Sequence, residues 1–306
     1  VGEDGWELSI KALIDNADCS HKARFTLIDA DGNEKASAIA DLRPIISAKL
    51  PVEDPVLWNG RKNPYLYTVR CEIFEGTTQE VTDNIDIRTG LREYHIDSHK
   101  GFFLNGEHIK LQGVSRHQDR ENMGNAITEK QHAEDVKIIL DVGANSVRLA
   151  HYQQNSYFYD LCDESGLLVW AEVPVISLFS PKRNENAEQQ LVELIKQNYN
   201  HPSIFCWGIE NEITIAGSAS KKLITFLKHM HKIARHLDPT RYTTCAQLTM
   251  CPVNSPLNHI TDIIGYNHYY GWYMGSCDEI NNWLDEWHRE NPEGKLCLSE
   301  YGAEGI

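Results

Sequence analysis

The sequence predicts a chain of two domains, a β-sandwich followed by a parallel α/β barrel. Residues 1–93 contain short runs in which apolar and polar residues alternate, separated by turn signals such as Asp31-Gly32. After about residue 94, apolar strands alternate with amphipathic helical segments, the pattern of a parallel sheet covered by helices. We therefore expect the domains to span residues 1–93 and 94–306.

The first domain is assigned from runs with the two-residue period of strands. Residues 6–14, 23–29 and 65–74 are the clearest of these runs. Several short strands at this spacing are typical of a β-sandwich.

The second domain is assigned from seven strand candidates, which begin at His108, Ala144, Leu167, Ser203, Arg241, Asp262 and Lys295. Helices are predicted between them, including residues 128–142 behind a threonine cap and residues 219–237 before Asp238-Pro239. A (β/α)₈ barrel has eight strands. We therefore expect a barrel truncated after strand seven, with an open seam.

Composition narrows the classes of partner. The net charge of −15 repels phosphate backbones and anionic lipid surfaces, and no long run of Lys or Arg offsets it, so neither nucleic acid nor a membrane is expected as a partner. The eight cysteines show neither a CxxC pair nor the spacing of a disulfide framework. Most are predicted to be buried thiols in a reducing compartment, so a cytoplasmic location is expected.

Two glutamates end predicted strands and suggest chemistry. Glu212 closes NHPSIFCWGIENE and Glu300 lies in KLCLSEYG. Active-site groups of a parallel barrel lie at the carboxyl ends of its strands, and glycoside hydrolysis uses two carboxyl groups, one protonated and one ionised. The alternative is that both residues are structural, with Glu212 capping a helix and Glu300 forming an ion pair.

Six segments of the chain, two of which contain Glu212 and Glu300, together resemble a known family. The chain carries GVSRHQD (113–119), GANSVRLAHY (143–152), GLLVWAEVP (166–174), NHPSIFCWGIENE (200–212), GYNHYYGWY (265–273) and LSEYG (298–302). In this order they resemble glycoside hydrolase family 2, whose members retain anomeric configuration. The resemblance implies an immunoglobulin-like β-sandwich followed by a (β/α)₈ TIM barrel, with Glu212 as acid/base and Glu300 as nucleophile.

The same resemblance assigns supporting residues. Arg148 is expected beneath the nucleophile, where a guanidinium would hold its charge, and Tyr269 is expected as a second donor. Asn211 resembles the asparagine that binds the sugar 2-hydroxyl. The structural alternatives are a surface salt bridge for Arg148 and a helix N-cap for Asn211.

Other polar residues near predicted strand ends are candidates for the sugar pocket. His117, His151 and Asn267 are expected to line the sugar pocket. Asp119 and Arg120 could belong to the site, but an ion pair within the loop would equally account for their presence. Glu172 ends a predicted strand and could reach the site, but the turn that follows it could equally make it a cap for backbone groups. We therefore do not count Glu172 among the predicted catalytic residues.

The sequence also bears on a catalytic metal and on the sugar. The stretch VPVISLF (173–179) offers no carboxylate or imidazole ligand, so no catalytic metal and no other cofactor is expected. Overall resemblance favours a β-galactoside as substrate, with a β-glucuronide as the alternative and a β-mannoside third. Ala303 departs from the pattern of large β-galactosidases. An alternative of a different class is a non-catalytic fragment that binds carbohydrate or only contributes structure. A homo-oligomer is possible.

Overall fold

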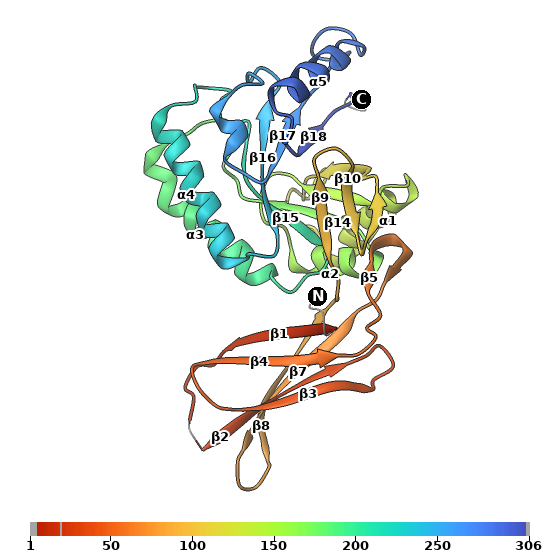
Figure 1. Ribbon diagram of the computed structural model, residues 1–306, viewed down its shortest axis with the longest axis vertical. Coiled ribbons are helices and arrows are strands. Elements are labelled where there is room, and N and C mark those ends of the chain that lie inside the picture. Colours follow the sequence, from red (N-terminus) through yellow and green to blue (C-terminus); the bar gives the residue numbers. More distant parts are fainter. Residues whose placement is uncertain (1–4, 19, 304–306) are drawn as a thin grey trace. The chain divides into compact units, whose positions relative to one another are not determined.

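The computed structural model of the chain describes residues 5–18 and 20–303, and the chain divides into two compact units (Figure 1). The first runs to Arg92 and takes in residues 200–202, and the second holds residues 93–199 and those from Ser203 onward.

The first unit is an immunoglobulin-like β-sandwich. Its four-stranded antiparallel sheet has the order β3-β2-β7-β8, and β1 pairs with β4 as a second layer. The strands are β1 (Trp6–Leu13), β2 (His21–Ile28), β3 (Glu34–Asp41), β4 (Ile45–Val52), β7 (Tyr67–Glu75) and β8 (Val81–Thr89), with the short pair β5 (Trp58–Asn59) and β6 (Asn63–Pro64) around η1 (Gly60–Lys62).

Apolar side chains from the two layers of the sandwich form its core. Leu27 of β2 and Tyr67 of β7 pack with Leu50 of β4, and Phe25 packs with Ile46. Alternate residues along β1 differ in burial, following the two-residue period that predicted a strand at residues 6–14, and β4, which was not predicted from sequence, shows the same alternation.

The second unit opens with an antiparallel sheet of three strands, β9 (Tyr94–Asp97), β10 (Gly101–Leu104) and β11 (Glu107–Ile109). The expectation that His108 begins the first barrel strand is therefore wrong. Asn105 and Gly106 both have positive φ angles, 49° and 80°, so the chain turns back as a tight hairpin and His108 pairs with Phe103.

A parallel sheet of seven strands follows, in sequence order from β12 to β18. The strands are β12 (Gly113–Arg116), β13 (Ser146–Leu149), β14 (Leu168–Glu172), β15 (Ile204–Asn211), β16 (Tyr242–Leu248), β17 (Ile263–Asn267) and β18 (Leu296–Glu300). This is the TIM-barrel arrangement, and β12 and β18 have no partner beyond them among the described residues. All strand carboxyl ends lie at one edge of such a sheet.

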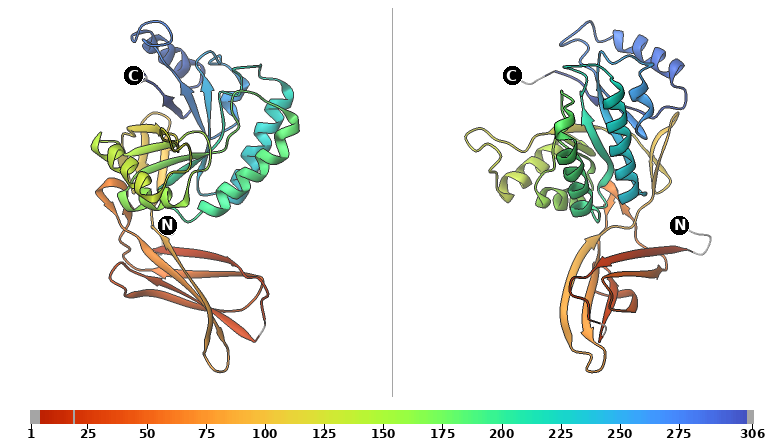
Figure 2. Two further views of the ribbon diagram at one scale, coloured as in Figure 1. Left: turned by 180° about the vertical axis from the view of Figure 1, so that it is seen from behind. Right: turned by 90° about the vertical axis from the view of Figure 1, so that its left-hand side faces the viewer.

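Helices connect the parallel strands, and α3 and α4 lie side by side on the outside of the sheet (Figure 2). They are α1 (Glu129–Asp141), α2 (Ser156–Ser165), α3 (Asn184–Asn198), α4 (Lys221–Leu237) and α5 (Glu279–Glu290), with the short turns η2 (Pro181–Arg183) and η3 (Pro256–His259). The two predicted helices are α1 and α4. Thr128 and Gln131 form a capping box at α1, and the Ser220 side chain caps α4.

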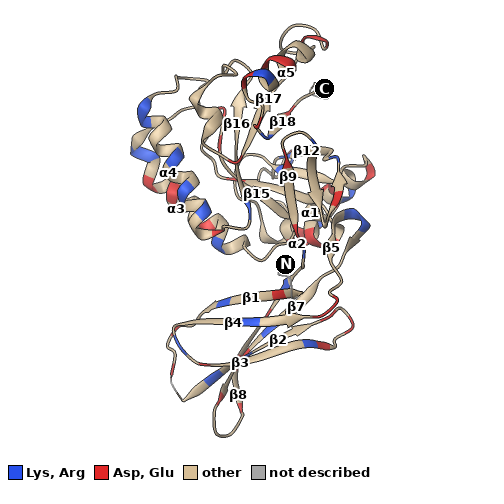
Figure 3. Cartoon of the chain, viewed as in Figure 1, with Lys and Arg blue, Asp and Glu red and all other residues tan. Residues whose placement is uncertain are grey.

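The barrel core lies between the strands and these helices. Buried side chains such as Val147, Val169 and Trp207 of the sheet belong to one cluster with Leu191 of α3 and Leu227 of α4. Most charged residues of α3 are acidic, whereas the charged residues of α4 are all Lys or Arg (Figure 3). No helix in the described ranges has both the length and the apolar content that crossing a bilayer requires.

Candidate active site

Glu300, the last residue of β18, is bound by two donors. Arg148 Nη1 donates to its Oε1 over 2.6 Å, and the Tyr269 hydroxyl donates to its Oε2. Burial and the hydrogen bond to Glu300 raise the pKa of Tyr269, so its hydroxyl keeps the proton that it donates. Both carboxylate oxygens of Glu300 therefore have a hydrogen-bond donor, one of them the charged guanidinium.

Arg148 is the centre of a buried network. The side chain is 5% exposed, and its Nε and Nη2 donate to the two oxygens of Glu172 over 3.0 and 3.2 Å. Its Nη2 also donates to Asn211 Oδ1 over 2.8 Å. Burial alone would lower the pKa of Arg148, but the carboxylates of Glu172 and Glu300 outweigh this effect and raise it. The surface salt bridge considered from sequence is therefore wrong for Arg148.

Glu172, the last residue of β14, is a site residue that sequence reasoning left out. Its side chain is fully buried, and besides Arg148 it binds His151, whose Nδ1 lies 2.5 Å from Oε1. Burial would raise the pKa of Glu172, but the Arg148 charge and the His151 hydrogen bond outweigh it, so the pKa is lowered. An ionised Glu172 only accepts, so His151 Nδ1 carries a proton. The signal available in the sequence was the position of Glu172 at a strand end.

His151 and His117 lie beside the nucleophile candidate. His151 Nε2 is 3.6 Å from Glu300 Oε1, and the two imidazole rings meet edge to face with centroids 5.4 Å apart. Burial, and then the neighbouring His151, lower the pKa of His117 and favour its neutral form. Both histidines line a cavity of about 440 Å³ together with Arg148, Tyr269 and Glu300.

Glu212 follows β15 and binds a neutral amide. Asn267 Nδ2 donates to Glu212 Oε1 over 2.9 Å and to Asn211 Oδ1 over 3.1 Å, and Asn267 Oδ1 accepts from Ser299 over 2.8 Å. Asn267 is fully buried at the end of β17. Asn211 is the last residue of a strand and its side chain faces Arg148, so the helix N-cap reading is wrong.

The eight site residues predicted from sequence thus lie together. Side-chain hydrogen bonds connect Arg148, Glu300, Tyr269, Asn211, Asn267 and Glu212, His151 Nε2 lies 3.6 Å from Glu300 Oε1, and the His117 ring contacts the His151 ring. Arg120 instead binds Glu134 and Asp135 of α1, each over 2.6 Å, which is the loop ion pair considered as its alternative.

Glu210 is a second buried carboxyl group next to this network. It is fully buried in β15, where Oε2 accepts from the Ile213 N–H and Oε1 from Gln247 Nε2, each over 3.1 Å. Burial, and further the nearby charge of Glu172, raise its pKa to about 8. Glu210 is therefore mostly protonated at neutral pH.

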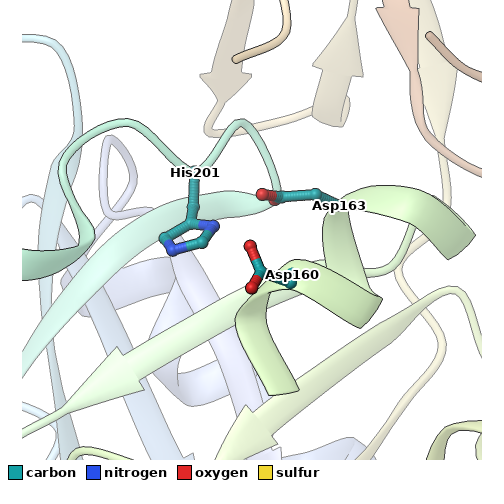
Figure 4. A group of neighbouring side chains, drawn as sticks. All are labelled: Asp160, Asp163 and His201. Atoms are coloured by element: carbon teal, nitrogen blue, oxygen red, sulfur yellow. The ribbon is translucent and has the colours of Figure 1, made fainter. Parts of the chain in front are cut away.

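The prediction that no metal takes part in catalysis stays a prediction. Away from the cavity, Asp160 and Asp163 project from α2 with carboxylate oxygens within 4.8 Å of each other (Figure 4). Asp163 Oδ1 accepts the N–H of Ser203 over 3.0 Å, so this carboxylate stabilises the backbone at the start of β15. Neither aspartate lines the cavity that contains Glu300.

Replacing Gly208 by Ala should destabilise the site. A Cβ at Gly208 would lie 2.5 Å from Glu172 Cβ and 2.6 Å from Trp170 Nε1, whereas one at Gly217 would meet no atom within 4 Å. We expect Gly208→Ala to lower the free energy of unfolding by about 1–3 kcal/mol through overpacking, and Gly217→Ala to change it by less than about 0.5 kcal/mol. Urea unfolding measures both, and equal effects would contradict this packing argument.

Glu210→Gln should change how stability depends on pH. The carboxyl group titrates near 4.5 when exposed and near 8 in the folded chain, so between these values the folded state binds more protons than the unfolded state. The contribution of Glu210 to the free energy of unfolding of the parent chain therefore falls as pH rises through this window, with a slope of at most about 1.4 kcal/mol per pH unit. The variant lacks this contribution.

The measurement for Glu210→Gln is urea unfolding of both proteins at pH 5 and pH 8. The groups that face Glu210 are Glu172, Arg148 and Cys245, and they are common to both proteins. The difference between the two slopes therefore isolates Glu210. Parallel pH dependences would show that Glu210 is ionised throughout this range.

Two family models match the chain. The model described as "Glycosyl hydrolases family 2" matches residues 3–92, and "Glycosyl hydrolases family 2, TIM barrel domain" matches residues 96–306.

Individual relatives carry two activity names. A β-glucuronidase of Bacteroides fragilis is 41% identical over 83% of this chain and 36% of its own length, and a β-galactosidase of Thermoanaerobacter pseudethanolicus is 32% identical over 78% and 32%. The crystal structure of an FMN-binding β-glucuronidase from Facaelibacterium prausnitzii L2-6 superposes with a TM-score of 0.93 at 43% identity, covering all of this chain and 47% of that one. The chain thus spans about a third to a half of the length of these relatives. With family models matching both its sandwich and its barrel, the chain belongs to glycosyl hydrolases family 2.

Proposed function

We propose that the protein containing this chain is a retaining glycoside hydrolase that cleaves terminal β-glycosides by double displacement, with Glu300 as nucleophile and Glu212 as acid/base. The observation that carries the proposal is the different environment of the two glutamates. Glu300 has a cation and a hydroxyl on its two oxygens, whereas Glu212 is bound by the neutral amide of Asn267. These are the environments that an ionised nucleophile and a proton-carrying acid require.

The proposed reaction has two steps. In the first, a Glu300 oxygen bonds to the anomeric carbon while the bond to the leaving oxygen breaks, and Glu212 gives that oxygen its proton. In the second, Glu212 takes a proton from water, the water oxygen bonds to the anomeric carbon, and the ester to Glu300 breaks. The second displacement restores the original configuration and regenerates both carboxyl groups.

The pocket supplies groups suited to a sugar. His151 and His117 present imidazole nitrogens beside Glu300, and such nitrogens donate to or accept from hydroxyl groups. Next to Tyr269, but not among the residues that line the cavity, Trp272 and Tyr273 stack on each other with ring centroids 3.9 Å apart. They are 36% and 68% exposed, so part of each ring surface is open to a pyranose ring.

For the sugar itself we favour a β-glucuronide, with a β-galactoside second. This order reverses the one suggested by sequence resemblance. Two relatives at 41% and 43% identity are named β-glucuronidases, whereas a β-galactosidase and a putative β-galactosidase match at 32% and 36% identity. A glucuronate carboxylate needs a cation. Arg148 is the cation among the described residues lining the cavity, and it already binds Glu172 and Glu300. In the β-glucuronidases that this chain resembles, an Asn-x-Lys segment supplies such a cation, and we expect the same of the protein that contains this chain.

Hydrolysis of 4-nitrophenyl β-glucuronide, β-galactoside and β-mannoside tests the function and the sugar together. The protein should carry its native flanking sequence, with the Glu300→Gln variant as control. We expect glucuronide turnover that the substitution lowers by more than about 1,000-fold, because the amide cannot attack. Galactoside turnover alone would change the substrate, and silence on all three would favour the non-catalytic reading.

Azide distinguishes the roles of the two glutamates. A Glu212→Ala enzyme should still form the glycosyl adduct from a substrate with a good leaving group, and azide, which needs no general base, should then release it as glycosyl azide and raise kcat. Glu300→Gln should not respond, because no adduct forms. Equal acceleration of both variants, followed as product anomers by NMR, would contradict the assignment.

A further inference from the structure

The strand that leads to Glu212 contains a bulge. In the pairing of β15 with β16, Gly208 lies opposite Thr244 and Asn211 lies opposite Ala246, so three steps on β15 match two on β16. The extra residue falls at Ile209 and Glu210. A bulge re-aims the side chains that follow it, and here Asn211 faces Arg148 while Glu210 lies beside Gln247.

Glu212 itself has a left-handed backbone, with φ of 49°. A residue with a Cβ adopts this conformation only where surrounding contacts hold it. Two amides next to its Cα are fixed. The Glu212 N–H donates to the Ala246 carbonyl over 2.8 Å, and the Ile213 N–H donates to Glu210 Oε2 over 3.1 Å.

Burying the carboxyl group of Glu210 at this position is energetically unfavourable. It is fully buried, and none of the described residues forms an ion pair with it. Burying a carboxyl group costs free energy that an apolar side chain of the same size does not. Its two hydrogen bonds show what the apolar side chain would lack, which is an acceptor for the Ile213 amide.

We propose that Glu210 is a positioning residue for Glu212. By accepting the Ile213 N–H, its carboxyl group fixes the left-handed backbone at Glu212 and so sets where the Glu212 carboxyl group meets Asn267 and the leaving oxygen. The inference rests on the proposed acid/base role of Glu212. It adds a residue that contacts neither substrate nor nucleophile and acts through the backbone alone.

Leaving-group dependence tests this proposal in the protein with its native flanks. Protonation by a general acid matters for a poor leaving group such as phenol and little for 4-nitrophenol, and kcat/KM reports this first step. We expect Glu210→Met to lower kcat/KM by about 30-fold or more for the phenyl glycoside and less than about 3-fold for the 4-nitrophenyl glycoside. Glu210→Gln keeps an acceptor and should keep both values within about 3-fold.

Controls separate positioning from general damage. Gln247→Met removes the other hydrogen bond of Glu210 but leaves the Ile213 contact, so it should not change the ratio between the two substrates. If Glu210→Met does not fold, Glu210→Asp, which withdraws the carboxyl group by one methylene, should show the same selective loss. Equal losses on both substrates, or none, in the variant that folds would overturn the proposal while leaving the proposed function intact.

If the parent protein cleaves none of the glycosides, that result contradicts the proposed function and leaves the role of Glu210 to a measurement that needs no turnover. Hydrogen exchange, followed by mass spectrometry on peptides that contain Ile213, should be slow in the parent and in Glu210→Gln and at least about 10-fold faster in Glu210→Asp. Fast exchange in the parent would overturn the proposal.

Discussion

The buried guanidinium of Arg148 is the interaction on which the site depends. It lies between two carboxylates, Glu172 and Glu300, and its Nη2 also donates to Asn211. Each of these groups would carry a large desolvation penalty alone, and each is tolerated because the others supply opposite charge or hydrogen bonds. Removing one member of such a network leaves an uncompensated charge on the others, so the arrangement is held as a unit.

This network also explains why the two glutamates differ. Glu300 shares the positive charge of Arg148 with Glu172, and Tyr269 completes its hydrogen bonding. Glu212 lies one step further from that charge, with Asn267 as an uncharged link. Asn267 is fixed in turn by Ser299. One parallel sheet thereby provides two carboxyl groups with different electrostatic surroundings, as acid and nucleophile chemistry requires.

The backbone contributes as much as the side chains. Parallel strands bring Arg148, Glu172, Asn211, Asn267 and Glu300 to one edge of the sheet. Gly208 leaves the room in which Glu172 approaches β15, and the bulge after it lets neighbouring residues Glu210 and Asn211 take unrelated partners. The geometry of the site is therefore set by strand register before any substrate is considered.

Features that depend on neighbours along the chain could be predicted from the amino-acid sequence. Alternation in the first domain predicted the sandwich, repeated strand and helix patterns predicted the parallel barrel, and the Thr128 cap predicted the start of α1. Ordered motifs around Glu212 and Glu300 indicated the family and eight residues that lie together. The folded chain was needed to show that Glu172 binds Arg148 and His151, that Glu210 binds the Ile213 amide, and that His108 belongs to a hairpin. Caps and periodicity act within a few residues, whereas the partner of a buried charge is fixed by register between strands that lie far apart in the sequence.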